Sequence, residues 1–221
     1  MNIQYKWLLL AGFQLITGIA SAQKTSPLVD RKATKETQAL ARNLKKLSQN
    51  AVLFGHQHAT EYGHGWSNGA DSNRSDVKSV TGSHPAVVGF DFNALFGRTE
   101  AGTERSTTAL RKLVTNTYNR GGVTTIAWHF SNPVSNTNFY WNDSTASPAV
   151  RHIIPGGSHH DKYKQILGTV ARFALSCKGA DSTLAPMIFR PFHEFDGDWF
   201  WWGAGHCTKE EFVSLWRFTV S

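Results

Sequence analysis

Residues 187–203 read MIFRPFHEFDGDWFWWG, an apolar segment that runs into a cluster of polar and aromatic residues. The apolar opening is typical of a short buried strand, and Pro186 stands just before it. Glu194 follows this strand between Phe192 and Phe195, so we expect its carboxyl group to be partly withdrawn from water. A carboxyl group in such a place can protonate a leaving group near neutral pH.

The aromatic residues after Glu194 indicate a sugar site. Indole rings offer flat apolar faces that suit the C–H faces of pyranose rings. Arg190, His193 and Asp196 can donate hydrogen bonds to sugar hydroxyls or accept them. The stretch therefore predicts a carbohydrate site with an acid at the end of a strand.

Strand patterns alternate with helix patterns along the chain, which predicts a parallel α/β sheet. Residues 61–74 are rich in glycine, serine and asparagine and predict a long loop. Residues 208–211 (Thr-Lys-Glu-Glu) form a capping box that opens the last helix. The expected strands are 52–55, 86–92, 123–130 and 187–192, and helical spacing covers 31–46, 110–118, 163–174 and the residues after 211.

Four strand–helix units are half of what a closed (β/α)8 TIM barrel contains. We therefore predict an α/β fold that forms the amino-terminal half of such a barrel, with the chain ending inside the fourth helix. An open four-stranded parallel sheet is the alternative. It is less favoured, because a parallel sheet needs helices on both faces and this sequence offers few.

In a βα barrel the chemistry gathers at the carboxyl ends of the strands, so the polar residues there are the candidates. A single histidine at such a place is as often structural as functional, but agreement among four strands favours a shared site. The candidates are His56, Gln57 and His58 after the first strand, Asp91 and Asn93 after the second, His129, Ser131 and Asn132 after the third, and His193 and Glu194 after the fourth.

The sequence resembles glycoside hydrolase family 26, the β-mannanases, over residues 51–218. Arg-Pro-Phe-His-Glu at 190–194, followed by Gly-Asp-Trp-Phe-Trp-Trp-Gly at 197–203, is similar to the family's acid/base motif at the fourth strand. The segments 54–57, 89–91 and 127–129 are similar to those that end the first three strands.

The resemblance implies retaining endo-hydrolysis of β-1,4-mannosidic bonds in mannan, galactomannan or glucomannan. By this resemblance Glu194 is the general acid/base and His193 orients it and contacts the sugar. His129 and Trp199 line the same subsite, and no cofactor or metal is implied. A glucanase or xylanase of the same family is the alternative within the resemblance.

A retaining glycosidase needs a second carboxyl group about 5–5.5 Å from the first. In the resembled family this nucleophile ends the seventh strand, which the present sequence does not reach. We therefore expect the 221-residue chain to lack the nucleophile and to show no appreciable turnover. Asp91, Asp196 and Asp198 are available substitutes, but none stands in the nucleophile's place in the family pattern.

Two other classes of function remain open from the residues. A non-catalytic mannan-binding protein could use Trp141, Trp199, Trp201 and Trp202 as its platform, but such modules usually show an all-β pattern. A metal site is weakly indicated, since nothing resembles H-E-x-x-H. Its candidate ligands are His56, His58, His64, His159, His160, His193 and Glu194.

Residues 1–22 are typical of a signal peptide, with Lys6, an apolar core and Ala20-Ser21-Ala22 as a cleavage site. We therefore expect a catalytic domain over 23–221 in a periplasmic or secreted monomer, with no membrane association after cleavage. An uncleaved anchor is the alternative, although the apolar core is short for a membrane span.

The net charge of +7 does not by itself indicate nucleic acid. In residues 31–46 leucines recur at helical spacing with lysines opposite them, which is typical of a solvated helix face. We expect no nucleic-acid partner. Cys177 and Cys207 should lie at opposite ends of the fourth strand, too far apart for a disulfide, and are predicted to be free thiols.

Overall fold

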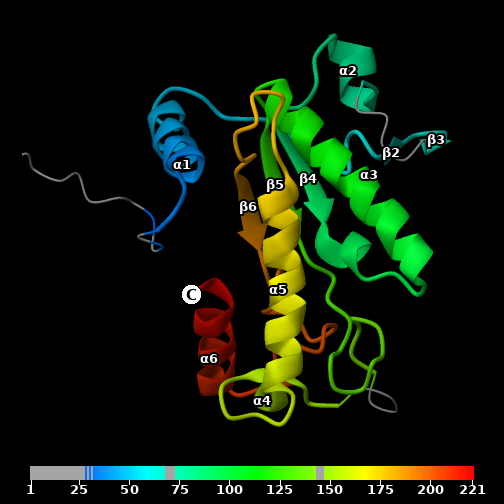
Figure 1. Cartoon of the computed structure of the whole chain (residues 1–221), viewed down its shortest axis with the longest axis vertical. Coiled ribbons are helices and arrows are strands. Elements are labelled where there is room, and N and C mark those ends of the chain that lie inside the picture. Colours follow the sequence, from blue (N-terminus) through cyan, green and yellow to red (C-terminus); the bar gives the residue numbers. More distant parts are fainter. Residues whose placement is uncertain (1–27, 29, 31, 68–72, 143–146) are drawn as a thin grey trace, which may run out of the picture.

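The computed structural model describes residues 28, 30, 32–67, 73–142 and 147–221, so the expected signal peptide at 1–22 lies outside the described residues. One parallel sheet organises the fold, with its strands side by side in chain order (Figure 1). Its strands are β1 (Gly55–Gln57), β4 (Val87–Asp91), β5 (Val123–Ala127) and β6 (Met187–Arg190). The helices that follow them are α2 (Asp76–Thr81), α3 (Glu100–Asn119), α5 (His160–Ser176) and α6 (Lys209–Val220).

This arrangement is the predicted amino-terminal half of a (β/α)8 barrel: four parallel strands, each succeeded by a helix. β4 pairs with β1 on one side and with β5 on the other, and β6 pairs with β5. Among the described strands β1 and β6 are therefore the edges of the sheet.

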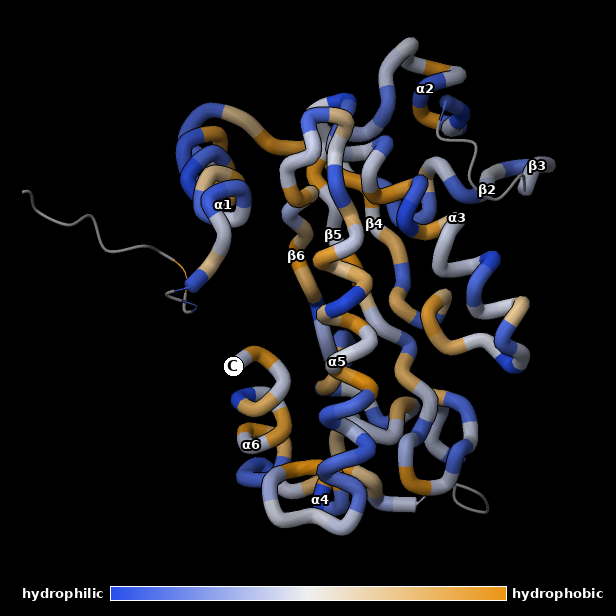
Figure 2. Tube along the Cα trace, viewed as in Figure 1, coloured by the Kyte–Doolittle hydropathy of each residue, from blue (hydrophilic) through white to orange (hydrophobic). Residues whose placement is uncertain are grey.

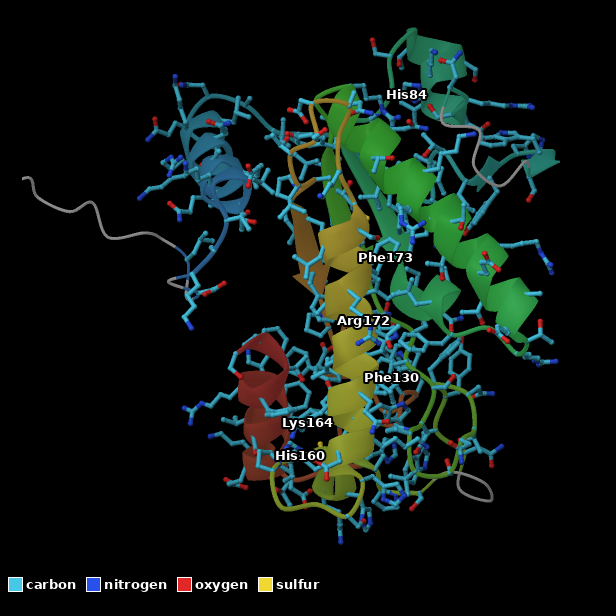
Figure 3. The ribbon with its side chains drawn as sticks, viewed as in Figure 1. His84, Phe130, His160, Lys164, Arg172 and Phe173 are labelled. Carbon is cyan, nitrogen blue, oxygen red and sulfur yellow. The ribbon has the colours of Figure 1, made fainter. Side chains whose placement is uncertain are left out.

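The outer face of the sheet is the side covered by helices. The strand register brings Val88, Phe90, Thr124 and Ile126 to this face, and all four are buried. The helices α3 and α5 lie across this face (Figure 1). Phe173 belongs to α5, and Phe130 lies next to that helix (Figure 3). Each large apolar side chain buried here contributes about 1.5–3 kcal/mol of transfer free energy.

The inner face of the sheet carries the alternate residues and is more open. Ile188 is 36% exposed, and Arg190 is exposed while its Nε donates to Thr125 Oγ1 at 3.1 Å. Gly89 also lies on this face, and a side chain there would overlap that of Gln57. The inner face thus holds Gln57 against Gly89 and leaves the β6 residues Ile188 and Arg190 accessible.

The observed strands are shorter than predicted, and the first is displaced. Strand pairing begins at Gly55, which lies opposite Val87; before it, the Phe54 carbonyl accepts from the Val87 amide at 3.2 Å, and Val52 is almost fully exposed. β4 ends at Asp91 because the Asp91 side chain caps the 3-10 helix η1 (Phe92–Leu95). The predicted ends at 130 and 192 are likewise too late, since β5 ends at 127 and β6 at 190.

Residues 61–74 are not entirely loop. They contain a short hairpin of β2 (Tyr62–Gly63) and β3 (Trp66–Ser67), and residues 68–72 lie outside the described part. Gly65 lies at the turn with φ +70°, a conformation that glycine adopts without steric cost.

The first and last helices match their sequence signals. α1 (Lys35–Leu47) buries none of its residues fully and is largely hydrophilic in Figure 2, as a solvated helix face requires. α4 (Val150–Ile153) is a single turn before α5. The capping box of α6 is confirmed: Thr208 Oγ1 accepts from the Glu211 backbone, and the Glu211 carboxylate accepts from the Thr208 backbone.

Cys177 and Cys207 are both free thiols, and burial raises the pKa of each to about 11. Cys177 is fully buried just after α5, and Cys207 precedes α6. In the part of the chain that the structure describes, no helix combines the length and apolar character needed to cross a membrane.

Candidate active site

The chain turns sharply where β6 ends. Phe192 and Glu194 have φ angles of +52° and +57°, in the left-handed region that residues with side chains rarely adopt. Such conformations cost of order 1–3 kcal/mol each and persist where the surrounding structure enforces them. Here Trp202 Nε1 donates to the His193 carbonyl at 3.0 Å, and the Gly197 amide donates to the Glu194 carbonyl at 3.1 Å. The turn buries Phe192 and exposes Glu194.

The aromatic run after Glu194 divides between core and surface. Phe200, Trp201 and Trp202 are almost completely buried, and Trp201 Nε1 donates to the Phe130 carbonyl at 2.6 Å. Trp199 and Phe195 are about half exposed. The predicted sugar platform is therefore smaller than the sequence indicated, because two of its four tryptophans, Trp201 and Trp202, belong to the core and Trp141 is only partly exposed.

Glu194 is held by Trp199 across the turn. Trp199 Nε1 donates to Glu194 Oε2 at 2.9 Å. Gly197 permits this contact, since a Cβ there would overlap the Trp199 ring. The expected partial withdrawal of Glu194 from water is wrong for this chain: the side chain is exposed because its aromatic neighbours Phe195 and Trp199 are exposed themselves.

Three strands contribute to a row of hydrogen-bonding side chains beside Glu194. Asp91, at the end of β4, has its Oδ2 atom 2.5 Å from Nδ1 of His129. His129, two residues after β5, has its Nε2 atom 3.2 Å from Nε2 of His193. His193 directly precedes Glu194, so the row leads from the second strand of the sheet to the predicted acid.

His193 is packed between this row and the aromatic core. Its ring lies 5.3 Å from Phe200 and 5.8 Å from Trp202, centroid to centroid. Burial lowers the pKa of His193 and His129 lowers it further, while Glu194 and Asp91 act in the opposite direction. Its Nδ1 atom is buried and makes no hydrogen bond. The environment thus favours a neutral imidazole.

The end of β1 forms a separate cluster. His58 Nδ1 lies 2.6 Å from Glu61 Oε2, and the His58 ring stacks on Tyr62 at 4.9 Å. The pKa of Tyr62 is raised by burial and then by the charges of Glu61 and Asp91, so the cluster is within electrostatic reach of the end of β4. Gln57 Nε2 donates to the Phe90 carbonyl at 3.1 Å, whereas His56 is exposed.

Two of the candidates serve the backbone instead of a site. Asn132 is buried; its Oδ1 accepts from the amides of Val134 and Ser135, and its Nδ2 donates to the Ser147 carbonyl. Asn93 reaches Asp91 through its backbone amide, not through its side chain. These contacts explain why a polar residue after a strand need not line a site.

The histidines considered for a metal are spread over the fold. The His64 backbone amide bonds to Asp76, while His159 and His160 open α5 far along the chain. Within residues 32–67, 73–142 and 147–221, no group of three or more histidine, cysteine, aspartate or glutamate side chains is placed to hold a metal ion.

The chain is similar to known proteins of one family. The family model described as "Glycosyl hydrolase family 26" matches residues 29–221. The chain belongs to glycosyl hydrolase family 26. It is 35% identical over 206 residues to a mannan endo-1,4-beta-mannosidase of Bifidobacterium adolescentis, a match that covers 91% of this chain and 20% of that protein.

Solved structures of the family superpose on the chain. A β-mannanase of Bacteroides ovatus, BoMan26A, matches with a TM-score of 0.75 and 40% identity over 85% of this chain and 54% of its own. A modular endo-β-1,4-mannanase of Cellulomonas fimi matches with a TM-score of 0.77 and 37% identity over 87% of this chain and 43% of its own. The chain thus spans about half the length of these family 26 structures, in agreement with the half-barrel arrangement.

Asp91 has a role that its place at a strand end and its carboxyl group do not indicate. In the structure it is bonded to His129. The parallel register contains the signal: Asp91 lies opposite Ala127, two residues before His129. The pairing of His58 with Glu61 was also missed, and its signal is their spacing of three residues.

Proposed function

We propose that this family 26 protein takes part in retaining endo-hydrolysis of β-1,4-mannosidic bonds in mannan, galactomannan or glucomannan, with Glu194 as the acid/base. The curated relatives named mannan endo-1,4-beta-mannosidase support this substrate. The observation that carries the proposal is the exposed Glu194 carboxylate held by the Trp199 indole, with His193 and His129 alongside.

This geometry suits a sugar ring at the end of β6. A pyranose stacked on the half-exposed Trp199 brings its glycosidic oxygen toward Glu194, which is bonded to the same indole. His193 and His129 line the side of this position and are proposed to contact the substrate. General acid catalysis by a group so placed contributes typically about 10²–10⁴-fold to the rate.

We propose that the second carboxylate lies in the part of the family domain that this chain does not span. Asp91 is a poor substitute, because its carboxylate already accepts from two backbone amides and faces His129 Nδ1. Asp196 and Asp198 lie in the same turn as Glu194, not across a cavity from it. The 221-residue chain is therefore proposed to bind mannan without appreciable turnover.

The wider setting is also part of the proposal. Residues 1–22 are proposed to be a signal peptide and 23–221 part of a catalytic domain in a periplasmic or secreted monomer. Its partner is a β-mannan polysaccharide or a manno-oligosaccharide. No nucleic acid, cofactor or metal is involved, and the cleaved protein is not bound to a membrane.

The test combines binding with product analysis on the purified chain. Mannohexaose is expected to bind without release of reducing ends, and Trp199→Ala is expected to weaken binding by about tenfold, since loss of a stacking face costs roughly 1–2 kcal/mol. Release of reducing ends that disappears in Glu194→Gln would contradict the missing-nucleophile part of the proposal.

The alternatives are separated by extending the protein through the complete family domain. Glu194→Gln is then expected to slow mannan hydrolysis by about 10²–10⁴-fold, with Glu104→Gln, at an exposed position of α3, as the matched control. An extended, folded protein that binds mannan but releases no product is a mannan-binding protein. Faster hydrolysis of xylan or mixed-linkage glucan than of mannan identifies the glucanase or xylanase alternative.

A further inference from the structure

We propose that Asp91 is a positioning residue that sets the tautomer of His193, two side chains away, through His129. With the carboxylate ionised and both rings neutral, the row Asp91–His129–His193 has one bonding pattern, which satisfies all its polar atoms except Nδ1 of His193. The tautomers belong to the chain itself, and only their consequence at Glu194 rests on the proposed function.

The Asp91 carboxylate fixes the first proton. Its Oδ1 accepts from the amides of Asn93 and His129 at 2.7 and 3.1 Å, and its Oδ2 lies 2.5 Å from Nδ1 of His129. An ionised carboxylate can accept hydrogen bonds but not donate them. Nδ1 of His129 must therefore carry a proton.

The second proton follows from the first. A neutral imidazole protonated at Nδ1 has an unprotonated Nε2 atom. Nε2 of His129 lies 3.2 Å from Nε2 of His193, so the proton between the two rings belongs to His193. This leaves Nδ1 of His193 unprotonated, and the same hydrogen-bond logic fixes ring tautomers in metal and catalytic sites.

The surroundings of His193 agree independently. Its Nδ1 atom is buried and makes no hydrogen bond. Buried N–H groups without partners are rare in proteins, whereas acceptors with unused lone pairs are less costly. Burial is the largest cause that lowers the pKa of His193, which favours the neutral ring at pH 7.5.

The consequence concerns the neighbouring acid. With its proton on Nε2, a neutral His193 presents an unprotonated Nδ1 and places no positive charge beside Glu194. If Glu194 is the acid/base, Asp91 fixes the tautomer of its neighbour without touching the substrate. Asp91 thus acts through His129 and His193 as a positioning residue.

The tautomers can be read directly by NMR. In the full 221-residue chain with ¹⁵N-labelled histidine, long-range ¹H–¹⁵N spectra at pH 7.5 distinguish the two ring nitrogens. Peaks are assigned from His129→Gln and His193→Gln. The expected result is a protonated Nδ1 in His129 and a protonated Nε2 in His193, and an Nε2-protonated or doubly protonated His129 overturns the proposal.

Asp91→Asn gives a sharper test. Two backbone amides point at the Oδ1 position, so the asparagine oxygen occupies it and the NH₂ group faces His129 Nδ1. His129 is then expected to change to the Nε2-protonated form and His193 to the Nδ1-protonated form. Asp196→Asn, at an exposed site, is expected to change neither ring.

Each outcome is decisive. A folded Asp91→Asn chain in which His193 keeps its Nε2 proton overturns the coupling through His129. If that variant does not fold, the wild-type spectrum still supports or overturns the assignment. Mannohexaose binding is measured separately, so a chain with the expected tautomers and no affinity contradicts the proposed function alone.

Discussion

The two faces of the sheet differ in how completely they are packed. On the outer face Val88, Phe90 and Ile126 are fully buried beneath α3 and α5. On the inner face Ile188 and Arg190 remain accessible to solvent. The outer face therefore carries the hydrophobic stability of the chain, whereas the inner face and the strand ends carry polar groups that are free to meet a ligand.

The largest difference between the faces is expected from one matched pair of substitutions. Ile126→Ala removes a fully buried side chain and is expected to lower the free energy of unfolding by about 2–5 kcal/mol. Ile188→Ala acts on the open face and is expected to change it by less than about 0.5 kcal/mol. Urea unfolding followed by circular dichroism measures both, and equal costs would show that the inner face is packed in solution.

A second pair sharpens the comparison within the aromatic run. Trp202→Phe leaves the part-buried His193 carbonyl without its donor and is expected to cost about 1–3 kcal/mol of stability. Trp199→Phe removes a partly exposed indole and is expected to leave stability within about 0.5 kcal/mol. Thermal unfolding compares them, and a larger loss for Trp199 would place that residue in the core.

The smallest effect is expected where the two regions meet, at His193. Burial lowers the pKa of His193 in the folded chain. As the pH falls through the ordinary histidine range near 6.5, the unfolded chain therefore binds a proton at this residue before the folded chain does. Stability is therefore expected to fall from pH 7 toward pH 5 and to level off below the folded pKa.

His193→Gln is expected to make this pH dependence shallower in urea unfolding measured at each pH. His84, whose pKa is also lowered chiefly by burial, continues to contribute in both proteins and lies away from the site (Figure 3). His84→Gln is the matched control, and it is expected to remove only the contribution of His84 to the pH dependence of stability. An unchanged slope in His193→Gln contradicts the expectation.

The strand order and the family could be predicted because their signals are local. Alternating strand and helix patterns indicate a parallel sheet, and the motif at 190–194 with its aromatic continuation indicates the acid at the fourth strand. The boundaries were less accurate, since strand ends depend on partners: residues 52–54 have strand-like composition but lie beyond the start of β4.

The polar contacts of the site could be predicted less well than its location. Composition places Asp91 and His129 at strand ends, but their bond depends on the register between β4 and β5. The same limit applies to the tryptophans. In the sequence Trp199, Trp201 and Trp202 cannot be distinguished, whereas in the structure Trp201 and Trp202 are buried after the left-handed turn and Trp199 is half exposed. Exposure of Glu194 likewise depends on which neighbouring rings reach the surface.

The match between chain order and spatial order in the sheet bears on biosynthesis. β1, β4, β5 and β6 lie side by side in the order in which a ribosome makes them, so each newly made strand finds the preceding one as its neighbour. No strand has to be inserted between two that have already paired. The sheet can therefore grow by accretion during translation, at about 5–20 residues per second, ahead of any contact with later parts of the polypeptide.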